Sequence, residues 1–133
     1  MTHYYVKSCY IKNRAAFIIA VLGCINREVN KIERGEREKR QKFGEALDAL
    51  ARYLMAALRI EKYPEYVLNM YDCLEATQIG SYYSKVQESA DEVVKLLEDD
   101  ITVHFTGPYG DIWSDFEAWL PDFKGKIKIK YEG

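Results

Sequence analysis

The chain has 133 residues, 48% of them hydrophobic and 30% charged, a composition that excludes global disorder and allows a buried core in one domain, residues 1–133. Charge is uneven: residues 1–62 hold 13 basic and 7 acidic residues, residues 63–123 hold 2 and 13, and residues 124–133 hold 4 and 1. A total of −2 therefore conceals an acidic middle between two basic ends, a distribution that concerns partners and association rather than fold.

Residues 3–11 alternate loosely and are rich in Tyr and Val, which predicts a strand. Asn13 can then cap a helix. The apolar residues that follow recur at spacings of four and three: Ile11, Ala15, Ile18, Leu22, Ile25, Val29 and Ile32. Phe17, Ile19 and Val21 widen the apolar surface at the front of this helix.

Residues 33–42 contain no apolar side chain, and a second seam follows them, formed by Phe43, Leu47, Leu50, Leu54 and Leu58. Two antiparallel helices, over 13–33 and 42–60 with Gly35 ending the first, fit this pattern. One continuous helix over 13–60 is the alternative, but it would leave two apolar seams without cover in a small domain.

The second half of the sequence predicts short helices and two strands. Pro64 suits the start of a helix that residues 78–80 break, and Ser81 or Ser84 can cap the next one. Its core stripe is Val86, Ala90, Val93 and Leu97.

Strands are expected at 101–106 and 126–131, separated by a turn and a short helix over 112–120 that Pro121 stops. We therefore expect an α+β fold: a helical hairpin and two or three further helices, packed with a three-stranded sheet of the N-terminal strand and two C-terminal strands.

An acidic, aromatic surface is the first candidate binding site. Its residues are Tyr109, Asp111, Trp113, Asp115 and Asp122. Aromatic side chains beside carboxylates suit docking to a basic protein partner or to a second copy of the chain. The leading hypothesis is therefore a small non-enzymatic interaction protein, a profile shared by accessory and inhibitor proteins of viruses and mobile elements.

A nucleic-acid-binding module is the second hypothesis, because basic residues gather at the hairpin tip and along the last strand. These residues are Arg34, Arg37, Arg40, Lys42, Lys126 and Lys128. Acidic residues interleave with the basic ones at the tip, where pairs such as Glu33–Arg37 and Glu36–Arg40 would neutralise them.

A small enzyme centred on His104 and Asp111 is the third hypothesis. His104 shares a strand face with Thr102 and Thr106, and acidic residues flank the strand. The spacing matches no metal or cofactor motif, so we expect neither. Three cysteines without motif spacing fit reduced thiols, and the longest apolar run, residues 15–23, is far short of the roughly 20 residues that span a bilayer. With no signal-peptide pattern, these features predict a cytoplasmic or intracellular protein without a membrane partner.

Overall fold

The computed structural model describes residues 1–7, 11, 13–62, 76–107, 116–118 and 120–132. The elements formed by these residues are, in chain order, β1 (Thr2–Lys7), α1 (Arg14–Asn30), the 3₁₀ helix η2 (Arg34–Glu36), α2 (Arg37–Lys62), α4 (Ala76–Leu96), β2 (Ile101–Thr106) and β3 (Ile127–Glu132). The fold is α+β, and the N-terminal strand and the two C-terminal strands form one sheet, as predicted.

The sheet is parallel throughout, in the order β1-β2-β3, so β2 is its central strand. Tyr4 of β1 lies opposite Val103 of β2, which lies opposite Ile129 of β3. Parallel neighbours require a crossover connection. The helices α1, α2 and α4 all belong to the crossover from β1 to β2.

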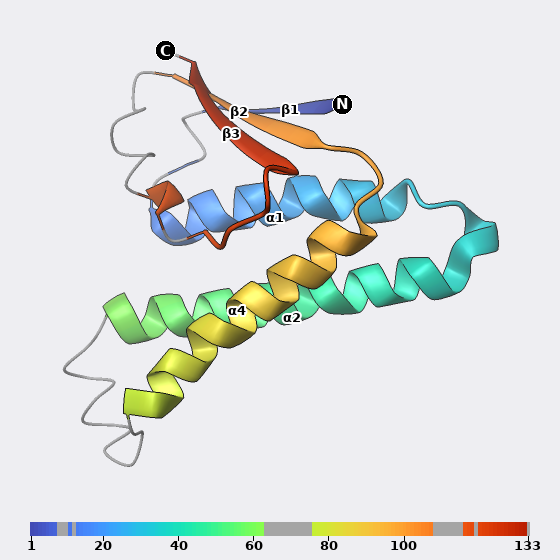
Figure 1. Cartoon of the computed structure of the whole chain (residues 1–133). Helices are drawn as coiled ribbons and strands as arrows, with labels where there is room; N and C mark the ends of the chain where they lie inside the picture. The colour runs from blue at the N-terminus through green and yellow to red at the C-terminus, as the bar shows by residue number, and fades with distance from the viewer. Residues whose placement is uncertain (8–10, 12, 63–75, 108–115, 119, 133) are drawn as a thin grey trace.

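The helical hairpin is confirmed, and the alternative of one continuous helix is wrong: α1 and α2 run antiparallel and are joined through η2 (Figure 1). Asn13 caps α1 as predicted, since its Oδ1 accepts a 2.8 Å hydrogen bond from the Ala16 N–H. The prediction that Gly35 ends the helix is wrong. The helix ends at Asn30, where the Lys31 N–H bonds to helix carbonyls, and Gly35 lies in η2.

The helix α1 is the central layer of the fold, between the sheet and α2 (Figure 1). The predicted apolar seam is buried along one side of α1. On another side of the helix, Phe17 stacks on Phe105 of β2, with ring centroids 4.5 Å apart. Ile19, expected to widen the apolar surface, is instead 59% exposed, because it faces neither layer fully.

The predicted break at residues 78–80 and the predicted caps at Ser81 and Ser84 are wrong, because α4 continues through them to Leu96. A glycine inside a helix costs only about 1 kcal/mol relative to alanine. Burial of the stripe formed by Val86, Ala90, Val93 and Leu97 outweighs that cost. The helix predicted from Pro64 begins outside the described residues, and most of the one predicted over 112–120 lies outside them.

Candidate functional site

Side chains from alternate positions of the three strands form a surface that we call the open face of the sheet. Its members are His3, Tyr5, Lys7, Thr102, His104, Thr106, Lys128, Lys130 and Glu132. The opposite face packs on α1, and no helix of the described residues covers the open face (Figure 1). Parallel sheets normally carry helices on both faces, so a face without a helix over it in the described part of the chain is unusual.

A hydrogen-bonded chain of three side chains crosses the open face from one edge strand to the other. His104, on the central strand, places Nδ1 2.6 Å from Glu132 Oε1 on β3. Its Nε2 lies 2.8 Å from His3 Nδ1 on β1. His104 is only 6% exposed, because side chains of both edge strands cover it, whereas His3 and Glu132 are exposed at the two ends.

The contact with Glu132 assigns one proton on His104, and the proton between the two rings follows when His104 is neutral. A carboxylate only accepts hydrogen bonds, so His104 Nδ1 carries the proton that Glu132 accepts. With a neutral His104 ring, Nε2 has a lone pair, which accepts from His3 Nδ1–H. His3 in turn keeps a lone pair on Nε2, at the exposed end of the chain.

Tyr5 adds an aromatic surface above this chain. Its ring stacks on the His104 ring with centroids 4.6 Å apart and an angle of 13° between the planes. Tyr5 is nevertheless 67% exposed, one of three large hydrophobic residues with high exposure in the described part of the chain. The face of the Tyr5 ring that points away from His104 is therefore available to a second planar group.

Three lysines, Lys7, Lys128 and Lys130, give the open face a positive charge. Lys130 lies in register with His104, and Lys128 with Thr102. Among the described residues, none of the three lies within 4.0 Å of a carboxylate, whereas the neighbouring Lys126 pairs with Asp100 at 3.3 Å. Of the two lysines predicted as nucleic-acid contacts on the last strand, Lys128 lies on this face, whereas Lys126 belongs to an ion pair.

A hollow of about 450 Å³ continues the open face around the free edge of β1. Tyr5 and Lys7 border it from the strand, and Arg27 and Cys24 border it from α1. Burial raises the pKa of the Cys24 thiol, so this cysteine is not a ready nucleophile. The hollow therefore contributes shape and positive charge beside the exposed Tyr5.

A polar cluster beneath the sheet holds β1 against α1. The Tyr4 hydroxyl donates to the buried Glu28 carboxylate at 2.5 Å, and Lys31 Nζ lies 3.0 Å from the same oxygen. Burial, followed by the adjacent Glu28, raises the pKa of Tyr4. Each of these groups has its partner inside the fold, so we interpret the cluster as structural.

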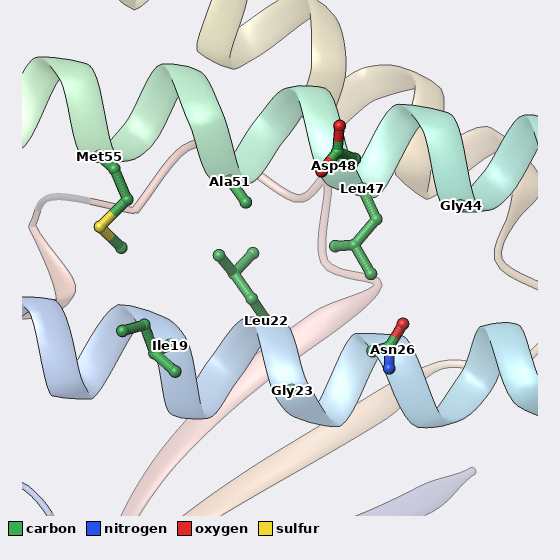
Figure 2. Close-up of a pocket in the computed structure, with 9 residues that line it drawn as sticks. All are labelled: Ile19, Leu22, Gly23, Asn26, Gly44, Leu47, Asp48, Ala51 and Met55. Atoms are coloured by element: carbon green, nitrogen blue, oxygen red, sulfur yellow. The ribbon is translucent and has the colours of Figure 1, made fainter.

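A second groove, of about 520 Å³, runs between α1 and α2 (Figure 2). Apolar side chains such as Leu22, Leu47 and Met55 line most of it, and the small Gly23 and Gly44 leave it open. It contains no cluster of polar groups that could act chemically.

Most of the predicted acidic, aromatic surface lies outside the described residues, namely Tyr109, Asp111, Trp113 and Asp115, so that surface stays a prediction. Asp122 is exposed, but its carboxylate accepts the Lys124 N–H at 2.8 Å in a turn where Lys124 has a φ of 56°. Gln87 of α4 also bonds both backbone groups of Asp122. Asp122 therefore stabilises the turn that leads into β3.

Two of the four basic residues predicted at the hairpin tip, Arg40 and Lys42, have side-chain partners. Arg40 bonds Asn30 at 3.4 Å instead of the predicted Glu36, and Lys42 pairs with Glu38 at 3.5 Å. Arg37 is exposed, and Arg34 lies in η2. Figure 1 shows the tip at the far end of α1 from β3, so the structure separates the two parts of the predicted nucleic-acid surface.

The partners that the structure gives His104 were not predicted, and the predicted pairing with Asp111 is untested. Asp111 lies outside the described residues, and Asp100 pairs with Lys126 rather than with His104. Sequence reasoning missed His3, Tyr5 and Glu132 as site residues. Alternation places Tyr5 on the same face of β1 as His3, whereas Glu132 lies one residue beyond the strand predicted over 126–131.

Within the described residues, no group of three or more His, Cys, Asp or Glu side chains is placed to hold a metal ion. No helix in the same part of the chain is long and apolar enough to cross a membrane. Comparison with protein-family models, with curated proteins and with solved structures finds no match for this chain.

Proposed function

We propose that this protein binds single-stranded nucleic acid on the open face of its sheet. The observation that carries the proposal is the exposed Tyr5 ring, stacked on His104 in a face that also carries three lysines without a carboxylate partner among the described residues. Bases of a single strand stack on exposed aromatic rings, while Lys side chains neutralise the phosphates. A duplex keeps its base faces covered and offers Tyr5 nothing to stack on.

The open face also has the extent that a polymer requires. Lysines lie on both edge strands, Lys7 on β1 and Lys128 and Lys130 on β3, and the hollow beside β1 adds Arg27. A chain of nucleotides crossing the sheet would pass Tyr5 between these charges. This proposal keeps Lys128 from the nucleic-acid hypothesis. It drops Lys126, which pairs with Asp100, and the hairpin tip, which lies at the far end of α1 from β3.

Fluorescence anisotropy with a labelled oligothymidine strand tests the proposal. Tyr5→Ala removes one stacking platform, so we expect it to weaken binding by about 1–3 kcal/mol. The double variant Lys128→Ala/Lys130→Ala removes two phosphate contacts, so the slope of log affinity against log salt should fall by about 1.4.

The matched control is Arg37→Ala/Lys42→Ala, which removes the same charge from the hairpin tip and should leave affinity and slope unchanged. Equal losses from both double variants would show that binding follows total charge rather than the open face. Binding of an acidic peptide by a protein that ignores the labelled strand would indicate a protein partner and overturn the proposal.

A further inference from the structure

The protein contains two histidines, which are 101 residues apart in the sequence. Both belong to the hydrogen-bonded chain of side chains on the open face. Burying the imidazole of His104 is costly unless both ring nitrogens are bonded. The fold meets that cost with one partner from each edge strand, Glu132 and His3. If this position served only to stabilise the sheet, an apolar residue or a threonine would suffice. The arrangement therefore points to a role of the imidazole in proton transfer.

The direction of the hydrogen bonds makes His3 a proton acceptor. Glu132 fixes the tautomer of a neutral His104, whose Nε2 then accepts from His3 Nδ1–H and leaves the lone pair of His3 Nε2 at the exposed end. When His3 accepts a proton, its Nδ1–H still donates to His104, and the carboxylate at the other end of the chain stabilises the added charge. A carboxylate that orients and supports an imidazole base in this way is a recurring arrangement in hydrolytic enzymes.

We propose that His3 acts as the general base in cleavage of RNA bound on the open face, with His104 and Glu132 as positioning residues. This inference rests on the proposed function. RNA brings its own nucleophile, the 2′-hydroxyl, so the reaction requires a base, an acid and charge stabilisation but neither a metal nor a cofactor.

The step balances as a transesterification. His3 Nε2 takes the proton of the 2′-hydroxyl while the 2′-oxygen forms a bond to the adjacent phosphorus. The bond from phosphorus to the 5′-oxygen of the next nucleotide breaks, and that oxygen takes a proton from the His3 imidazolium or from water. The products are a 2′,3′-cyclic phosphate and a strand with a free 5′-hydroxyl.

The register of the sheet places positive charge near this base. His3 lies opposite Thr102, which lies opposite Lys128, and Lys130 follows two positions later opposite His104. Adjacent strands are about 4.8 Å apart, so the row from His3 to Lys128 is about 10 Å wide, a distance that one nucleotide can cover. When the 2′-hydroxyl of a ribose faces His3, Lys128 can therefore contact the phosphate next to that ribose.

The test uses the full chain, a labelled oligouridine strand and its 2′-O-methyl counterpart, in EDTA. Wild-type protein should cut the first strand, leave a cyclic phosphate, and bind the second without cutting it, because methylation blocks the nucleophile. His3→Gln keeps a polar side chain at an exposed position, so it should retain the fold and the affinity for the methylated strand while the cleavage rate falls at least 100-fold. Both proteins are purified in the same way, which controls for contaminating ribonuclease.

Glu132→Gln separates a positioning role from a structural one. We expect its affinity for the methylated strand to stay within twofold of wild type while the single-turnover cleavage rate falls at least tenfold. Binding of both strands without cleavage by wild type overturns this inference and leaves the proposed function intact, as does a His3→Gln variant that cuts at the wild-type rate. Failure to bind either strand overturns both.

Discussion

The groove between α1 and α2 predicts that two leucines of the same core respond differently to truncation. Leu50 is fully buried, whereas Leu22 lines the groove (Figure 2). Replacing either leucine by alanine removes three carbon atoms, which costs roughly 2.4 kcal/mol at about 0.8 kcal/mol for each buried CH₂. At Leu50 a closed cavity of about 80 Å³ adds about 2 kcal/mol, at about 24 cal/mol per Å³.

At Leu22 the vacated space joins the open groove, where water enters, so the cavity contribution is absent. We therefore expect a loss in unfolding free energy of about 4 kcal/mol for Leu50→Ala and about 2 kcal/mol for Leu22→Ala. Urea unfolding followed by circular dichroism measures both, and Ile19→Ala, which is 59% exposed, serves as a control with an effect of about 0.5 kcal/mol or less. Equal losses for the two leucines would refute the reasoning, because the groove would then be closed in solution.

Two further predictions concern the sheet. The Tyr131 hydroxyl donates to Glu117 at 2.7 Å, and burial, followed by that carboxylate, raises the pKa of Tyr131 well above its usual 10. A raised folded-state pKa favours the protonated phenol, so this stabilisation is present below about pH 10 and is lost as pH rises further. Urea midpoints between about pH 9 and 11 should therefore fall less steeply for Tyr131→Phe than for wild type. Deleting residues 1–7 removes β1 and uncovers the backbone edge of β2, so cooperative thermal unfolding should disappear; an unchanged melting temperature would contradict the observed strand order.

Local periodicity was sufficient to predict the helical hairpin and the faces of the strands. The seam through Ile18, Leu22 and Ile25 is buried as expected, because a spacing of three and four fixes one side of a helix whatever lies opposite it. Tyr4 is buried and Tyr5 exposed for the corresponding reason, since neighbouring residues of a strand point to opposite faces.

Features that depend on distant contacts could not be predicted in the same way. The continuation of α4 through Gly80 depends on packing against α2, which local propensity does not include. The contact between His3 and His104 requires that β1 and β2 be neighbours in a given register. Alternation placed His104 on one strand face with Thr102 and Thr106, but the strand predicted over 126–131 did not reach Glu132. Only the strand order β1-β2-β3 brings His3, His104 and Glu132 into one hydrogen-bonded chain.

The separation of 101 residues between His3 and His104 also has a consequence for synthesis on the ribosome. The contacts of α1 with α2 are local and can form while the chain is still emerging, whereas β1 has no strand to pair with until β2 has been made. During that interval β1 presents an unpaired backbone edge, the kind of surface through which nascent chains associate wrongly. The open face is therefore assembled last, and a chain truncated before β2 would contain helices but neither the sheet nor the histidine pair.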